Sequence, residues 1–386
     1  MILEQAPYPM SQAEKNMTGQ VTLFLCGDMM TGRGIDQILP YPGDPTLYEP
    51  SVRDAAEYVK LAERFTGPIP RPGQFDYIWG DALEIFRTER PQAKVINLET
   101  TITRSDTYWP SKDVHYKMSP KNIGCLTAAG IDCCVLANNH MLDWGIPGLL
   151  DTLKALDNAG IKHAGAGRNL REAQEPAILP AGEDPRVFVF SLGSTSSGIP
   201  TAWSAEEDRP GIYVIETQRN DPIRTLAQQI DKIKRPGDIV LVSIHWGGNW
   251  GYNIPPSQKN LAHRLVDETG VDIVYGHSSH HVKAIEVYKE RLILYGCGDF
   301  LNDYEGITGY ESFRGDLGLM YFAEVEPRSG KLHALRMIPT QVRRLRVNHA
   351  TAADSKWLGT LLNREGKRFG TAVQRSAENF LTLDWS

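Results

Sequence analysis

The segment Gly276-His277-Ser278-Ser279-His280-His281 places three of the ten histidines of this 386-residue chain side by side. It directly follows the apolar run 271–275, whose β-branched residues indicate a buried strand that ends at a turn. Neutral imidazole is the commonest metal ligand in proteins, and it also exchanges protons near physiological pH. The segment therefore predicts a metal-binding or proton-transferring site at the end of a strand.

Polar residues follow an apolar run at four other points, namely Asp28, Glu99, Asn139-His140 and His245. Because open α/β sheets bind their ligands at the carboxyl ends of their strands, we expect these side chains to converge on one edge. Each residue also has an ordinary structural interpretation. Asp28 could cap a helix, Glu99 could be a surface carboxylate, Asn139 and His140 could be turn residues, and His245 could be a core histidine.

The composition is that of a soluble globular protein, with 41% hydrophobic and 23% charged residues. A net charge of -6, without a cluster of basic and aromatic residues, argues against a nucleic-acid-binding surface. The five cysteines contain no CxxC motif, so we expect no disulfide framework. No apolar stretch resembles a signal peptide or a membrane anchor, and we therefore expect a cytoplasmic protein.

Strands and helices alternate along the first 280 residues, and mostly strands follow. This order predicts an α/β sandwich of two facing sheets flanked by helices. We expect the late apolar runs 283–288, 291–295, 318–325, 331–338 and 341–347 to form an antiparallel or mixed second sheet. The predicted organisation is a flexible tail over 1–18, one domain over 19–350 with a proline-rich insertion at about 40–75, and a C-terminal helix and polar tail over 351–386.

Six motifs occur in one order along the chain: Gly27-Asp28-Met-Met-Thr-Gly-Arg33-Gly, Asn97-Leu98-Glu99, Ala137-Asn-Asn139-His140-x-x-Asp143-x-Gly145, His245-Trp246-Gly247, Gly276-His277-x-x-His280 and Gly298-Asp299-Phe300. Together they resemble the CapA family of poly-γ-glutamate capsule synthesis proteins over roughly residues 20–325. That family is similar in fold to the calcineurin-like metallophosphoesterases. The resemblance implies a four-layer α/β/β/α sandwich of two mixed sheets flanked by helices.

The resemblance also implies a metal site that holds one or two divalent ions, with Mn, Mg, Ca, Fe and Zn all open. The matching ligand positions are Asp28, Glu99, Asn139, His245, His277 and His280. The sequence departs from the metallophosphoesterase pattern at two points. Met30 stands where the first motif has a histidine, and His277 and His280 are three residues apart rather than two.

In the family that the motifs resemble, the histidine after the ligating asparagine is an acid, which assigns a catalytic role to His140. Asp143 follows it by three residues and is expected to orient its ring, as carboxylates orient catalytic histidines. His281 has no counterpart among the ligands and is expected to donate to the substrate. Further candidates for substrate binding are Arg33, Trp246 and Asp299.

The sequence leaves several functions open. One is a metal-dependent enzyme acting on a phosphoester or on a peptide or γ-glutamyl substrate, in the biosynthesis of poly-γ-glutamate or of a peptide-derived product. A second is a metal-dependent peptide epimerase. A third is a non-catalytic protein that assembles a capsule or binds its polymer. The expected partner is a small molecule, a peptide or a γ-glutamyl polymer.

Overall fold

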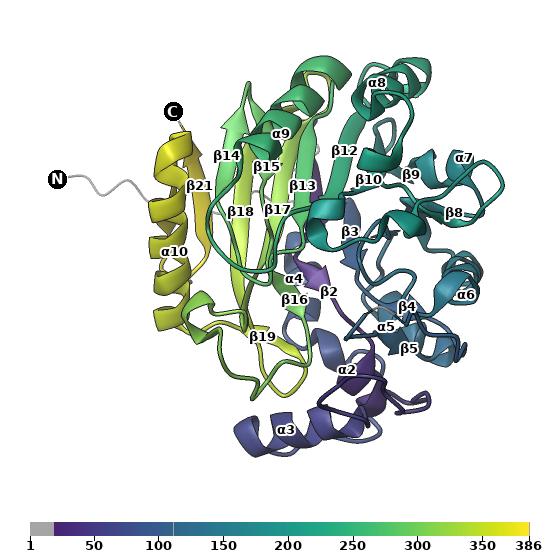
Figure 1. Ribbon diagram of the computed structural model, residues 1–386. Helices are drawn as coiled ribbons and strands as arrows, with labels where there is room; N and C mark the ends of the chain where they lie inside the picture. The colour runs from purple at the N-terminus through teal and green to yellow at the C-terminus, as the bar shows by residue number, and fades with distance from the viewer. Residues whose placement is uncertain (1–18, 111, 386) are drawn as a thin grey trace.

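The computed structural model describes residues 19–110 and 112–385, so the tail predicted for residues 1–18 lies outside the described residues. Two large β-sheets face each other between layers of helices (Figure 1). The six-stranded sheet has the order β14-β15-β13-β12-β10-β9. Its strands are β9 (Ala177–Pro180), β10 (Arg186–Gly193), β12 (Ile239–His245), β13 (Ile273–His277), β14 (Ile285–Tyr288) and β15 (Arg291–Leu294).

The larger sheet has eleven strands in the order β16-β2-β3-β1-β17-β18-β21-β20, with β6 joined to β3, β7 to β6, and β19 to β18. Its strands are β1 (Val21–Leu25), β2 (Asp28–Met29), β3 (Ala93–Leu98), β6 (Cys133–Val135), β7 (Lys162–Ala164), β16 (Asp299–Leu301), β17 (Leu317–Glu326), β18 (Lys331–Val342), β19 (Val347–His349), β20 (Thr371–Arg375) and β21 (Leu381–Trp385). Two small sheets pair β4 (Thr101–Ile102) with β5 (Lys117–Met118) and β8 (Ala166–Gly167) with β11 (Gly211–Ile212).

Helices cover both outer faces. The larger sheet packs against α2 (Arg33–Ile38), α3 (Ala56–Thr66), α4 (Ala82–Glu89), α5 (Gly124–Ala128) and α6 (Gly145–Ala159), and the six-stranded sheet against α7 (Leu170–Gln174), α8 (Pro222–Ile233) and α9 (Pro256–Thr269). α10 (Ala352–Gly366) lies beside β21 (Figure 1) and contributes leucines to the core between the sheets. Within the described ranges, no helix has the length and hydropathy needed to cross a membrane.

Alternation along the strands divides the core into layers. In β1, Leu23 and Leu25 enter the core between the two sheets, whereas Phe24 enters the core under the helices. In β12, Leu241 lies between the sheets and Val242 faces α8 and α9. Because successive strand residues point to opposite faces, each central strand contributes to two cores. The predicted four-layer α/β/β/α sandwich is therefore confirmed.

The sequence had suggested that the late strands form a second sheet of their own. In the structure they are divided between the two large sheets. β14 and β15 extend the six-stranded sheet next to β13, whereas β17 pairs antiparallel with β1 and carries β18 into the larger sheet. The run expected at 341–347 is split between the end of β18 and β19. Short turns allow an antiparallel neighbour on either sheet, so local pattern alone did not decide the assignment.

The segment after α10 was expected to be a polar tail, but it is a β-hairpin formed by β20 and β21. β21 pairs with β18 and closes the edge of the larger sheet. The buried residues Val373, Leu381 and Leu383 alternate with exposed ones and pack under α10. This two-residue period is short and lies among polar residues, which is why the hairpin was missed.

One side chain connects the two sheets just below the strand ends. The hydroxyl of Tyr275 on β13 donates to the carbonyl oxygen of Cys26 and accepts from its N–H at 3.1 Å. Both residues are fully buried. Tyr275 therefore satisfies backbone groups where the chain leaves β1 for Asp28.

We expect Tyr275→Phe to lower the free energy of unfolding by about 1–3 kcal/mol, because it leaves a buried donor and acceptor without a partner. Urea denaturation measures this loss. Tyr77→Phe is the matched control, because the hydroxyl of Tyr77 donates to Arg344 O at a half-exposed position. Equal losses in the two variants would contradict the role assigned to Tyr275.

Candidate metal centre

The inner face of both sheets changes from apolar to polar at the carboxyl ends of the strands. On β3 the inward row runs through Val95 to Asn97, and on β13 it runs through Tyr275 to His277. His245 ends β12 and is the register partner of His277. Asp28 on β2 is the register partner of both Asn97 and Asp299. The continuing two-residue period therefore aims these side chains into the space between the sheets.

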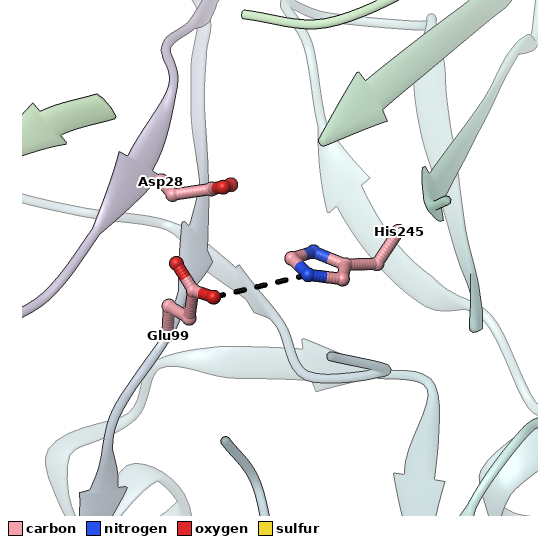
Figure 2. A group of neighbouring side chains, drawn as sticks. All are labelled: Asp28, Glu99 and His245. Carbon is pink, nitrogen blue, oxygen red and sulfur yellow. Dashed lines mark ion pairs between the residues drawn. The ribbon is translucent and has the colours of Figure 1, made fainter. Parts of the chain in front are cut away.

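Three of the predicted ligands converge. Asp28, Glu99 and His245 each offer one ligand atom, and these atoms all lie within 4.8 Å of one another. Figure 2 shows the three side chains pointing toward one another, with Glu99 Oε1 3.8 Å from His245 Nε2. All three residues are buried. Two carboxylates and an imidazole at this spacing suit a divalent cation.

His277 adjoins this group through Asp28. Its Nδ1 lies 3.0 Å from Asp28 Oδ1. The side chain of Asn97 donates to the same oxygen at 2.8 Å and lies 3.5 Å from His245 Nδ1. Asn97 thus contacts two predicted ligands, and sequence reasoning had assigned it no role. Its place in the alternation of β3, two residues after Val95, is the signal that would have identified it.

The loop after β6 is fastened by Asn138 rather than Asn139. The Asn138 amide donates to Asn97 Oδ1 at 3.0 Å, and its oxygen accepts from the His140 N–H at 3.0 Å. The side-chain oxygen of Asn139 is buried and has no hydrogen-bond partner among the described residues. Asn139, the residue predicted to ligate a metal, is therefore the one of the two whose side-chain oxygen is available.

Other buried atoms at this centre also lack partners. Within residues 19–110 and 112–385, His245 Nε2 and His277 Nε2 have no hydrogen-bond partner, like Asn139 Oδ1. Leaving a buried polar group unsatisfied costs about 1–3 kcal/mol, so native structures seldom contain several such groups together. The two imidazole nitrogens carry lone pairs in the appropriate tautomer and the amide oxygen always does, so each of the three atoms is able to ligate a cation. The residues present therefore fit a bound metal ion.

The protonation states of Asp28 and His245 also favour metal binding. Burial alone raises the pKa of Asp28, but its contacts with His277, His245 and Asn97 lower it to about 2. Burial lowers the pKa of His245 to about 3. At neutral pH Asp28 is thus a carboxylate and His245 a neutral imidazole, which are the forms that bind metals. Burial and the nearby carboxylates Asp28 and Asp299 raise the pKa of Glu99, and a cation would oppose this repulsion.

His140 lies beside this group and is held by carboxylate and lysine contacts. Its Nδ1 is 2.6 Å from Asp143 Oδ2 and 3.2 Å from Lys112 Nζ, and its Nε2 is 3.9 Å from Glu99 Oε1. The ring of Tyr116 stacks on the imidazole at 3.9 Å. Burial lowers the pKa of His140 to about 4, although Asp143 opposes the shift. The structure thus places Asp143 against His140, and it adds Lys112, which sequence reasoning did not select.

His280 does not belong to the three-residue group. Its Nδ1 contacts Asp299 Oδ1 at 2.9 Å, and the Asn302 amide holds the other oxygen of Asp299 at 2.8 Å. Burial lowers the pKa of His280, but the Asp299 carboxylate outweighs it and raises the value. The two residues form a further His/Asp pair, in which Asp299 is buried and the His280 side chain is 13% exposed.

Three other predicted contacts are engaged elsewhere. His281 is buried among aromatic rings, including Phe313 at 4.9 Å. The indole of Trp246 donates to Tyr295 O at 3.0 Å and packs in the core on the outer side of the six-stranded sheet. The guanidinium of Arg33 is buried and donates to Asp303, Glu49 and Tyr58. None of these groups points freely into the centre, so each would have to exchange protein contacts to bind a substrate.

Comparisons with known proteins match the region that carries the centre. The family model described as "Bacterial capsule synthesis protein PGA_cap" matches residues 22–304. The chain is 47% identical over 364 residues to a "Probable polyglutamine synthesis accessory protein" of Mycobacterium tuberculosis, covering 94% of this chain and 96% of that protein. It is 27% identical over 288 residues to "Capsule biosynthesis protein CapA" of Bacillus anthracis, covering 74% and 60%. It is 26% identical over 279 residues to "PGA biosynthesis protein CapA" of Bacillus subtilis, covering 72% and 62%.

Buried neutral histidines predict sensitivity to acid. Burial lowers the pKa of His281 to about 4, whereas an unfolded histidine titrates near 6.5. Between these values the unfolded state binds more protons, so the free energy of unfolding falls as pH drops below about 6.5. The loss is at most about 1.4 kcal/mol per pH unit for each such histidine.

We therefore expect His281→Gln to make the pH dependence of stability shallower between pH 6 and 4.5. Urea denaturation of chelator-treated protein at several pH values measures the slope. His349→Gln changes an exposed histidine and should keep the slope of the unmodified protein. A His281→Gln slope equal to that of His349→Gln would refute the assignment.

Proposed function

The chain belongs to the bacterial capsule synthesis protein family, and from this premise we propose that it is a metal-dependent hydrolase that acts on glutamate polymers during their biosynthesis. The observation that carries the proposal is the group of Asp28, Glu99 and His245, whose ligand atoms lie within 4.8 Å of one another beside the His140–Asp143 pair. The His140–Asp143 pair places a group able to transfer a proton next to this cluster, which catalysis requires and binding alone does not.

The proposed ligands are Asp28, Glu99 and His245, with His277 and Asn139 as the adjoining donors. A divalent cation bound there would polarise a carbonyl or phosphoryl oxygen and make a nearby water more acidic. Two imidazoles beside the carboxylates favour a transition metal such as Mn, Fe or Zn over Ca or Mg. His280 is bonded to Asp299 and is not needed for this set.

His140 is the proposed proton carrier. Because its Nδ1–H is directed at the Asp143 carboxylate, the lone pair of Nε2 faces Glu99 and the ligand group. In amide hydrolysis, His140 Nε2 takes a proton from water as the water oxygen bonds to the carbonyl carbon. The same proton passes to the leaving nitrogen when the C–N bond breaks. Water and amide thus become a carboxylic acid, which ionises, and a free amine.

The substrate class follows from the relatives. Their printed names concern capsule, PGA and polyglutamine synthesis, so a γ-glutamyl amide is the first substrate to test. A phosphoester is the next, because the metallophosphoesterase-like fold brings the same carboxylate and imidazole donors together. The same proton transfer by His140 serves both reactions, so a single set of variants tests either substrate.

Epimerisation at a peptide Cα is a second candidate, and one observation favours it. That reaction requires a base on one face of the carbon and an acid on the other. Besides His140–Asp143, the chain holds a His280–Asp299 pair, and Asp299 is the register partner of Asp28. Deuterium incorporation from solvent at Cα, without cleavage of the peptide, would distinguish epimerisation from hydrolysis.

The metal proposal is tested by single ligand replacements. We expect His245→Ala and His277→Ala to lower the affinity for a divalent cation at least about 10–100-fold, because even changes behind the ligands have effects of that size. Elemental analysis of purified protein and titration calorimetry measure it. His163→Ala removes a histidine that pairs with Asp157 near the surface and should keep the metal. Full occupancy in both ligand variants would favour a non-catalytic, polymer-binding protein.

The catalytic proposal requires that replacement of His140 lower turnover without lowering the metal content. We expect His140→Gln to reduce turnover by roughly 10²–10⁴ while retaining the metal. Asp143→Asn should reduce it less, because Asp143 only orients the ring. Rates on γ-glutamyl peptides and phosphoesters, with elemental analysis of each variant, provide the measurement. Loss of metal from His140→Gln would make His140 a ligand instead.

A further inference from the structure

Lys112 lies on the loop between β4 and β5, and its ammonium reaches the pair of residues assigned to proton transfer. We propose that Lys112 is a positioning residue that locks the Asp143 carboxylate and, through it, the tautomer and orientation of His140. The proposal rests on the function proposed for His140. It assigns a task to a side chain that no motif in the sequence singled out.

The contacts of the ammonium are all with the protein. Lys112 Nζ donates to Asp143 Oδ1 at 2.5 Å and to the backbone oxygen of Asn139. It also lies 3.2 Å from His140 Nδ1. Two of its three N–H groups are thus bonded to the segment that carries His140. Lys112 is therefore suited to hold this segment and the Asp143 carboxylate in place.

The carboxylate of Asp143 is fixed at both oxygens. Oδ1 accepts from Lys112, and Oδ2 accepts from the Tyr116 N–H at 2.8 Å while facing His140 Nδ1 at 2.6 Å. An ionised carboxylate only accepts hydrogen bonds, so the imidazole proton must be on Nδ1. Nδ1 then has no lone pair for Lys112, and the 3.2 Å approach is a contact rather than a bond. Nε2 consequently carries the free lone pair.

The surroundings strengthen the ion pair. The Lys112 side chain is 14% exposed and that of Asp143 is fully buried. The ring of Trp203 lies 5.1 Å from the ammonium, and Trp109 packs edge-on against Trp203. Water is largely excluded by these rings, and an ion pair gains strength when its surroundings are less polar. Removal of the ammonium would leave one carboxylate oxygen of Asp143 buried without a donor, free to turn away from His140.

The backbone holds the loop independently of Lys112. The Trp109 N–H donates to Asp143 O at 2.8 Å, and Tyr116 is fixed to Asp143 through its own N–H. These bonds remain when the lysine side chain is replaced. The effect of a substitution should therefore appear in the carboxylate and imidazole, and the loop should stay in place.

The test compares Lys112→Met, Lys112→Arg and the control Lys117→Met. Methionine keeps the length of the side chain without its charge, and arginine keeps the charge. Lys117 also lies next to the loop, with 10% side-chain exposure, and it pairs with Asp106 and packs on Trp144. It has no contact with His140. The three variants thus separate the loss of a lysine from the loss of this particular ammonium.

The first readout does not depend on activity. In protein labelled with 15N-histidine, with His140→Gln used for assignment, the Nδ1–H of His140 should be visible and slow to exchange with solvent. We expect Lys112→Met to accelerate that exchange at least tenfold, Lys112→Arg to show an intermediate rate, and Lys117→Met to match the unmodified protein. Metal content should be unchanged in all three.

The second readout is turnover on the substrate found in the screen. We expect Lys112→Met to lower kcat about 10–100-fold with KM nearly unchanged, and Lys112→Arg to recover part of the loss. If His140→Gln abolishes turnover while Lys112→Met changes neither kcat nor the exchange of Nδ1–H, the positioning role is refuted and the catalytic proposal stands. If the exchange accelerates but no His140 variant affects any activity, Lys112 orients His140 and the proposed function fails.

Discussion

The centre depends on the contacts of the Asp28 carboxylate, because they connect the two sheets. Asn97 approaches it from the larger sheet at 2.8 Å, and His277 approaches from the six-stranded sheet at 3.0 Å. The N–H of Ser278 reaches its other oxygen at 3.1 Å. Ser278 has a φ of 90°, a backbone conformation that is unfavourable for a residue with a side chain. The backbone is thus locally strained at Ser278, where its N–H donates to Asp28.

The same strands that build the core also place the polar groups of the centre. Tyr275 and His277 are two residues apart on β13, so the alternation that sends the tyrosine between the sheets sends the histidine there too. Asn97 follows Val95 in the same way on β3. The core ends and the site begins along one row of side chains, without a separate loop architecture. This continuity explains why the ligand atoms converge although they come from segments more than 200 residues apart.

Much of the sandwich and the convergence of Asp28, Glu99 and His245 could be predicted from the sequence, because apolar strands ending in polar residues are a local signal. The assignment of the late strands could not, because antiparallel neighbours are chosen by tertiary pairing. The alternation of side chains along β3 could have identified Asn97. Lys112 could not have been identified from the sequence, since it lies in a loop without periodicity and its partners are 27–31 positions away. Arg33 was predicted to bind substrate, and no local pattern indicated its burial with Asp303 and Glu49.

The spacing of the last histidine motif explains how the centre is divided. Residues two apart on a strand share a face, whereas residues three apart do not. His277 ends the inward row of β13, and the turn at Ser278 then carries His280 past the end of the strand. There His280 meets Asp299, which lies beside Asp28 in register but turns its carboxylate to this histidine. The turn that follows His277 thus accounts for a compact group of ligand atoms next to a separate His/Asp pair.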